Sequence, residues 1–241
     1  MANYRPIYRG YDRDSIITRP QHIDYTAPLI DRHSHLINLD EGAGSDIELN
    51  YVRRNEGILS GSVYPQAASI SGDSYEWLGK GLKLNSGSLD TLITTTDGID
   101  TLAKSSGISM VVRFRHFGHK AQGSSVNTIA QFGSLQLTLS INSGDSLVVY
   151  AASTAKTHKT VPKGEWVTLV VVHDGASSFI VTENKVTTHS FSSLGLSSGN
   201  RISIGGDYAS SSRYADCEVA FAHFYDKALP LDIAKRIVSD P

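Results

Sequence analysis

The segment ADCEVAFAHFYDKALPLDIAKRI, from Ala215 to Ile237, changes its hydrophobic period halfway along. Up to Tyr225 the apolar residues alternate as in a strand, and from Pro230 they recur every three to four residues as in a helix. Pro230 suits the first turn of a helix, where its missing N–H is not needed. The segment therefore predicts a buried strand followed by a short amphipathic helix that closes one end of a β structure. The predicted strand has Ala220, Ala222 and Phe224 on one face, and Val219 and Phe221 on the other.

Other segments upstream also read as strands. SLQLTLSI alternates apolar and polar residues. The apolar set, turned inward, is Leu135, Leu137, Leu139 and Ile141. The Ser/Thr-rich set, turned outward as an exposed surface, is Ser134, Gln136, Thr138 and Ser140. EWVTLVVVHDG is apolar on both faces, as expected for a central strand covered on both sides. Gly, Ser, Asn and Asp cluster between the runs, so the sequence predicts an all-β sandwich or jelly roll.

Composition limits the class of protein. The 241 residues include 22 basic and 24 acidic side chains, a balance that gives no reason to expect nucleic acid or an anionic membrane as partner. No apolar run approaches the ~20 residues needed to cross a bilayer. The single cysteine, Cys217, excludes an internal disulfide and a cysteine-based zinc cluster. Because Cys217 lies in a strand-like run, we expect it to be a small buried side chain.

Residues 1–32 differ from the rest of the chain. They contain spaced prolines, several tyrosines and only arginine as the basic residue, and they show no hydrophobic period. Disordered tails are usually poor in aromatic residues, whereas Tyr and Arg are enriched at protein interfaces. We therefore favour an extended docking arm over a free tail. The residues expected to contact its partner are Tyr4, Arg5, Tyr8, Arg9, Tyr11, Arg13, Arg19 and Tyr25.

Five short motifs resemble the concanavalin A-like lectin/glucanase superfamily, in its laminin-G-like branch. The C-terminal one is Tyr225-Asp226-Lys227-Ala228-Leu229-Pro230, followed by the short helix. GEWVTLVVVHDG with FIVTENKV resembles the tryptophan strand of the family and the strand after it, although Glu183-Asn184-Lys185 stands where Asp-Gly is usual. GKGLKLNSGS, HLINLDEGAG and NEGILSG resemble three further landmarks. The resemblance covers residues 33–241 and implies a jelly-roll β-sandwich with an extended N-terminal arm and a short C-terminal helix. It also implies that Trp77 and Trp166 belong to the core.

The chemistry of known glucanases in this superfamily is not visible in the sequence. Those enzymes carry paired carboxylates on one strand in a Glu-x-Asp-x-x-Glu motif, which this chain lacks. His173 lies beside Asp174, but no nucleophile elbow accompanies the pair. We therefore expect no catalytic residues and a non-enzymatic protein, with a glycoside-active enzyme as the weakest alternative.

One loop, GGDYASSSRYAD, is the candidate ligand site. Tyr208, Arg213 and Tyr214 offer contacts to a glycan or a protein. Lectin-like and laminin-G-like domains often hold calcium at a rim, which makes Asp207 and Asp216 the candidate ligands here, although two solvated turn carboxylates are the simpler interpretation. No other cofactor is expected.

The resemblance and the arm together suggest a biological setting. Domains of this family usually act outside a cell, yet the start MANYRPIYRGYDRD lacks a secretory signal. Bacteriophage virion proteins, made in the host cytoplasm and released by lysis, meet both conditions. The leading hypothesis is a virion protein, anchored to a phage capsid or tail protein by its arm and assembled as a homo-oligomer or symmetric lattice. Capsid decoration is placed ahead of tail attachment. The main alternative is a soluble lectin or tail module that binds a host-surface glycan.

Overall fold

The structure is a computed structural model of the chain. It describes residues 107–239, with gaps at 121–123, 175–176, 192, 196–200, 211 and 226. Before residue 107 it describes the strands 34–38, 50–53, 65–66, 68–71, 76–77 and 91–94, for which only the backbone is considered, and residues 81–84.

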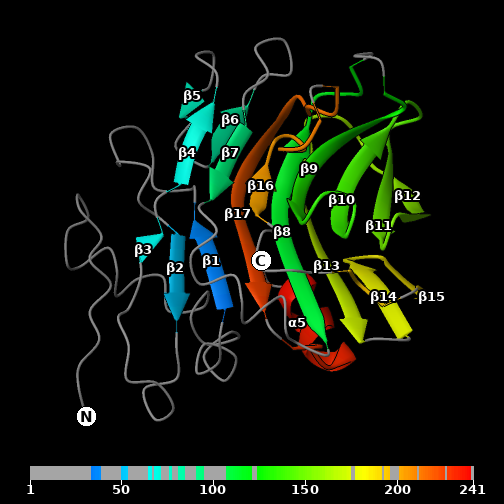
Figure 1. Cartoon of the computed structure of the whole chain (residues 1–241). Coiled ribbons are helices and arrows are strands. Elements are labelled where there is room, and N and C mark those ends of the chain that lie inside the picture. The colour runs from blue at the N-terminus through cyan, green and yellow to red at the C-terminus, as the bar shows by residue number, and fades with distance from the viewer. Residues whose placement is uncertain are drawn as a thin grey trace, which may run out of the picture.

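The described strands form two sheets in which all pairs are antiparallel (Figure 1). Across the first sheet the order is β15 (Lys185–Ser190), β14 (Ser177–Thr182), β13 (Val167–Asp174), β8 (Ile108–His116), β17 (Cys217–Tyr225), β1 (Ser34–Asn38), β2 (Asn50–Arg53) and β3 (Pro65–Gln66), with β6 (Leu82–Leu84) also on β17 and β5 (Glu76–Trp77) on β6. Across the second sheet the order is β12 (Thr154–Thr160), β11 (Ser146–Ala151), β10 (Leu137–Asn142), β9 (Val126–Phe132), β16 (Ile202–Ile204), β7 (Thr91–Thr94) and β4 (Ala68–Ser71). This arrangement confirms the predicted all-β sandwich.

The main core lies between the two sheets. Alternate residues of the central strands meet there, because successive side chains of a strand point to opposite faces. The first sheet contributes Met110, Phe114 and Leu169, and the second contributes Phe132 and Leu139, all with no exposed surface. Cys217 belongs to the same cluster and is fully buried, as predicted, and burial raises the pKa of its thiol.

A second apolar cluster lies on the outer face of the first sheet, where α5 (Leu231–Ser239) packs (Figure 1). Val170 and Val172 of β13 contact this cluster while Leu169 and Val171 contact the main core, so the prediction of a strand covered on both faces is confirmed. The buried face of the helix consists of Ala234, Ile237 and Val238. The switch from strand to helix at the C-terminus therefore serves to cover a second face of the sheet.

The corner between β17 and α5 is fixed by one buried hydroxyl. Ser109 on β8 donates from Oγ to the carbonyl of Lys227 at 2.7 Å and accepts from the backbone N–H of Leu229 at 2.9 Å. The hydroxyl thus satisfies two backbone groups at the turn, and an unpaired buried backbone group would cost free energy. Ser109 thus holds the chain in position where the helix begins.

The faces of β17 differ in part from the predicted assignment. Its register with β8 shifts between Val219 and Phe221, which marks a β-bulge. The bulge exchanges the two faces, so that Val219 shares the main core with Ala222 and Phe224, while Ala220 and Phe221 face α5. The prediction placed Ala220 with Ala222, and it was wrong because strict alternation ignores the extra residue.

The strand in SLQLTLSI is shorter than predicted, and its polar face is less exposed. It begins at Leu137, because Leu135 adopts a left-handed φ of 55° within a turn. Thr138 and Ser140 point away from the core but have no exposed surface. They lie between larger side chains of the flanking strands, Tyr150 and Gln131 beside Thr138 and Val148 beside Ser140.

In the part of the chain that the structure describes, no helix has the length and apolar character that crossing a bilayer requires.

Candidate functional site

The predicted ligand loop, Gly205–Asp216, is organised around a buried aspartate. The Asp207 carboxylate accepts from Gln131 Nε2 at 2.9 Å, from Ser134 Oγ at 3.0 Å and from the backbone N–H of Ala209 at 3.0 Å. It also forms an ion pair with Arg213, whose Nη1 lies 2.8 Å from Oδ2. The Asp207 side chain has no exposed surface, whereas that of Arg213 is 27% exposed. These contacts tie Asp207 to Gln131 on β9 and to Ser134 in the turn between β9 and β10, and they tie Arg213 to Asp207.

The three residues predicted to contact a ligand are only partly exposed, and all of them have structural partners. The hydroxyl of Tyr208 accepts from the backbone N–H of Ser134 at 3.3 Å, and Arg213 holds Asp207. Tyr214 forms an isolated parallel bridge with Thr128 on β9. The loop thus brings Tyr208 and Arg213 to the same aspartate-centred turn, and their contact with a ligand stays a prediction.

The two aspartates predicted as calcium ligands have different partners. Asp207 already accepts from four donors of the chain, one of them a guanidinium. Asp216 lies 3.3 Å from Lys120 Nζ. A calcium ion needs six to eight oxygen ligands, and cationic partners oppose its binding. Among the described residues, no group of three or more His, Cys, Asp or Glu side chains is placed to hold a metal ion. These contacts favour a structural role for both carboxylates.

The predicted docking arm, residues 1–32, lies outside the described residues, and so do its contact residues Tyr4 to Tyr25. Its role stays a prediction.

A different surface, not predicted from the sequence, gathers charged and aromatic residues on the outer face of the first sheet. We call it the Trp166 surface. Its residues are Lys83, Arg113, Arg115, Phe117, Trp166 and Glu218.

Three strands carry a row of charges across the Trp166 surface. Lys83 on β6 pairs with Glu218 on β17, and Glu218 pairs with Arg115 on β8. Both Nε and Nη2 of Arg115 lie 2.5 Å from Oε2 of Glu218. The Glu218 side chain has no exposed surface, and its second oxygen, Oε1, has no hydrogen-bond partner in the described structure. The strands β6 and β17 approach each other closely beside this row. A Cβ on Gly81, just before β6, would lie only 2.7 Å from the carbonyl oxygen of Val219 on β17.

Two aromatic rings flank the arginines of this row. The guanidinium of Arg115 lies 5.5 Å from the centre of the Phe117 ring and 5.3 Å from that of Trp166. Arg113 lies 5.8 Å from Trp166, and its Nη1 donates to Thr168 Oγ1 at 3.2 Å. Cation–π contacts of this kind hold both the ring and the cation in place. Trp166 packs against the α5 cluster and remains partly exposed. The prediction that it belongs to the core is therefore only partly correct.

The sequence contained a signal for this surface. In VVRFRHF, Val112 and Phe114 have the inward parity and Arg113 and Arg115 the outward one. Two arginines on one face of a central strand need anionic or aromatic partners, but Glu218 comes from β17 and Trp166 from the residue before β13, which no local pattern brings together.

The histidine beside Asp174 lies inside the sandwich. His173 is buried, and its Nδ1 lies 3.1 Å from the hydroxyl of Ser178, which is buried as well. The pair therefore forms a structural contact between β13 and β14.

Comparison with known proteins shows the fold. No protein-family model matches the chain, and no curated protein matches its sequence. Among solved structures, Trypanosoma rangeli sialidase in complex with sialic acid aligns with a TM-score of 0.59 and 10% identity over 93% of this chain and 38% of that one. Botulinum neurotoxin type C aligns with a TM-score of 0.59 and 13% identity over 89% of this chain and 52% of that one. The chain thus spans about half or less of the proteins that it resembles. The likeness establishes a lectin-like β-sandwich of the jelly-roll kind.

These neighbours correct the expectation of a non-enzymatic protein. A second structure of Trypanosoma rangeli sialidase, with a difluoro sugar, aligns with a TM-score of 0.60 and 11% identity over 85% of this chain and 32% of that one. Sialidases are enzymes that use a tyrosine nucleophile and depart from the two-carboxylate pattern of most glycosidases. The lack of a Glu-x-Asp-x-x-Glu motif therefore does not exclude an enzyme, and the prediction of a non-enzymatic protein was wrong to depend on it.

Proposed function

We propose that this chain is a carbohydrate-binding module and that the Trp166 surface holds the sugar. The observation that carries the proposal is the partly exposed Trp166 ring, fixed by two guanidinium groups. Aromatic rings supply apolar contact area to the faces of sugar rings, and guanidinium groups supply oriented hydrogen bonds to hydroxyl groups.

The proteins of similar fold support this proposal. One of them is a sialidase in complex with sialic acid, and another is a neurotoxin that depends on two ganglioside molecules to get into cells. Sugars are thus the ligands that the two structures have in common. The motifs in residues 33–241 resemble those of the laminin-G-like branch, and we propose this finer assignment as well.

A glycan array with the full chain, followed by calorimetry on the best ligand, tests the proposal. We expect Trp166→Ala to weaken binding at least tenfold, equivalent to about 1.4 kcal/mol, and Trp166→Phe to restore part of it. Tyr208→Ala is the matched control, because it removes an aromatic ring from the predicted loop. Thermal melting shows whether each variant is folded.

Three results would overturn the assignment of the site. If Tyr208→Ala abolishes binding and Trp166→Ala does not, the ligand lies at the loop with Tyr208, Arg213 and Tyr214. If both variants bind as tightly as the wild type, the sugar lies elsewhere. If no glycan on the array is bound, the chain is not a carbohydrate-binding module.

As a second proposal, which depends only on the composition of residues 1–32, we propose that the chain is a phage virion protein anchored by this arm. We expect the full chain to cosediment with phage particles that lack it, and the chain without residues 1–32 to remain in the supernatant while still melting cooperatively. Equal sedimentation of the two proteins would show that the arm is not the anchor, and absence of binding by both would remove the hypothesis. Sugar binding by the shortened chain is measured in parallel, because the lectin hypothesis predicts that it is unchanged.

A further inference from the structure

The two sheets meet at one side of the sandwich through polar residues. The strands at this side are β12, at the end of the second sheet, and β15, at the end of the first. His158 on β12 links them, with Nδ1 2.8 Å from the hydroxyl of Thr187 on β15 and Nε2 3.0 Å from that of Thr182 on β14. Lys185 Nζ donates to the carbonyl of His158 and adds a second link. We call this junction the β12–β15 seam.

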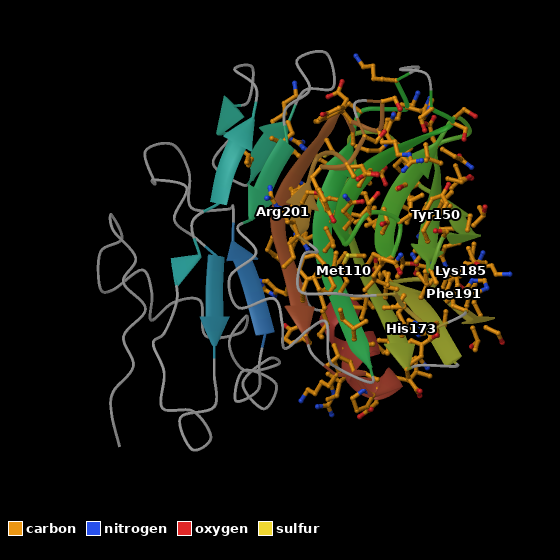
Figure 2. All side chains as sticks on the ribbon, viewed as in Figure 1. Met110, Tyr150, His173, Lys185, Phe191 and Arg201 are labelled. Atoms are coloured by element: carbon orange, nitrogen blue, oxygen red, sulfur yellow. The ribbon has the colours of Figure 1, made fainter. Side chains whose placement is uncertain are left out.

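Two lysines and a second histidine face this seam. Lys185 pairs across the ladder with Thr182, and His189 pairs with Ser178, and both partners are buried on the core side of β14. Lys156 pairs with Val149, which belongs to the main core. Since residues opposite each other in a ladder share a face, Lys156, Lys185 and His189 lie on the inner sides of their sheets, at the mouth of the seam. Figure 2 shows Lys185 and Phe191 together at this side of the molecule.

No described carboxylate neutralises these cations. The ion pairs formed by the described residues join Arg115 to Glu218, Lys120 to Asp216, Lys163 to Asp145 and Arg213 to Asp207. Glu183, in the turn just before Lys185, is exposed and forms no ion pair with it in the described structure. Positive charge is therefore concentrated at the seam without a matching acid.

The histidine at the mouth has an unused polar atom. Nε2 of His189 is buried and has no hydrogen-bond partner within the described structure, while its ring lies 5.8 Å from that of Phe191. Burial, and next the charges of Lys156 and Lys185, lower the pKa of His189. A buried polar atom without a partner costs free energy, and an anion that accepts a hydrogen bond from Nε2 would remove this cost.

Lysines on edge strands also serve to prevent pairing with other chains. Inward-pointing charges can serve that role too. Lys156 and Lys185 have the parity of the core side, where one hydrogen bond holds Lys185 against the neighbouring sheet. The observation that favours a ligand site over edge protection alone is Nε2 of His189, which has no hydrogen-bond partner among the described residues and lies close enough to both lysines for their charges to lower the pKa of its ring.

We propose that the β12–β15 seam is an oxyanion-binding site, in which the ammonium groups of Lys156 and Lys185 and Nε2 of His189 hold one carboxylate or sulfate group. Ammonium groups bind such anions as point charges, and Lys185 has two further protons to donate. The site is separate from the Trp166 surface and does not depend on the function proposed for it. The same chemistry would hold a free inorganic anion or the acidic group of a sugar.

The test follows the ring nitrogens of the histidines by NMR while sulfate, glucuronate or glucose is added to the full chain at constant ionic strength. We expect saturable shifts of the His189 nitrogens with sulfate, and none with neutral glucose. Saturation by glucuronate as well would assign the site to acidic sugars, whereas saturation by sulfate alone would assign it to inorganic oxyanions.

Charge-matched variants separate a site from general screening. Lys185→Met and Lys156→Met are each expected to weaken sulfate binding about tenfold, the effect of one charge-assisted hydrogen bond. Lys159→Met removes the same charge from the same strand at a position next to His158, and it is expected to change binding less than twofold. Trp166→Ala is expected to leave it unchanged. If no addition gives a saturable shift, or if Lys159→Met weakens binding as much as Lys185→Met, the proposal is wrong.

Discussion

The Trp166 surface and the β12–β15 seam both concentrate positive charge, but they are built differently. On the Trp166 surface, Arg115 has a carboxylate partner in Glu218, and both arginines lie against aromatic rings. At the seam, Lys156 and Lys185 have no described carboxylate partner. The first surface is therefore fixed by the chain itself, while the second leaves its charge to be balanced from outside.

The difference follows the chemistry of the two side chains. The planar guanidinium binds a carboxylate through two donors and stacks on rings, so an arginine cluster has one preferred geometry. The ammonium group of lysine is a compact charge on a flexible stem. A surface of the first kind suits the recognition of shape, and a site of the second kind suits the neutralisation of charge.

Removing the acid from the Trp166 surface should have the largest effect. Glu218→Gln removes the counter-ion of Arg115 at a fully buried position, and we expect the free energy of unfolding to fall by about 3 kcal/mol. Chemical denaturation measures it. Glu183→Gln, at an exposed carboxylate, is the control and should have no effect. An equal effect of the two variants would mean that Glu218 does not fix the surface.

The seam should respond to pH instead. Burial, followed by the charges of Lys185, Lys159 and His189, lowers the pKa of His158 from 6.5 to about 4. The unfolded chain then binds a proton that the folded chain does not, so stability is intact above pH 6.5 and is lost as the pH falls towards 4. We expect this loss to reach about 3 kcal/mol.

Denaturation of the wild type and of His158→Gln between pH 4 and 7.5 isolates this contribution. The variant keeps a neutral polar side chain but has no titrating group, so its stability should fall less steeply with acid than that of the wild type. Parallel curves for the two proteins would show that His158 does not cause the loss.

The loop holds a second pair of this kind, in which the buried acid Asp207 binds the partly exposed Arg213 and also accepts hydrogen bonds from three neutral donors. Asp207→Asn keeps the shape but removes the charge, and we expect a loss of about 2 kcal/mol. Asp216→Asn is the matched control, since its pair with Lys120 is more exposed and should contribute less than about 1 kcal/mol. A larger loss in the control would show that the loop is not organised around Asp207.

The smallest effect is expected when an acid is added to the seam. Lys156→Glu places a carboxylate at the mouth of the seam, where Lys185 also lies, and should stabilise the fold by only about 0.5 kcal/mol, as for other surface ion pairs. The same change should abolish sulfate binding, because it supplies the missing anion from within. Undiminished sulfate binding by this variant would contradict the proposed site.

The sequence was sufficient to predict the β-sandwich, the buried Cys217, the doubly covered β13 and the C-terminal helix. Each of these depends on a local period that the core enforces. The exchange of faces in β17 was missed, because the bulge comes from pairing with β8 and leaves no mark in the alternation of CEVAFAHFY.

The candidate sites were harder to predict, for a related reason. The loop was found because its aromatic and charged residues are close in sequence, but the use of Asp207 as its centre depends on Gln131 and Ser134 from far upstream. The Trp166 surface and the seam each draw residues from several strands. Only the strand order brings Lys83 next to Glu218. Only the strand order also brings Lys156, on the last strand of the second sheet, to the side of the sandwich where β15 is the last strand of the first.

The bulge in β17 also has a consequence for changes in chain length. Ala220 is the one residue of the strand without a partner on β8, because Val219 pairs with Phe114 and Phe221 pairs with Arg113. Deleting Ala220 would therefore restore a regular ladder in which Glu218 still pairs with Arg115, and Ala222 and Phe224 still face the main core. A single missing codon at this position should remove only one small side chain from the helix-covered cluster and keep the faces of both halves of the strand.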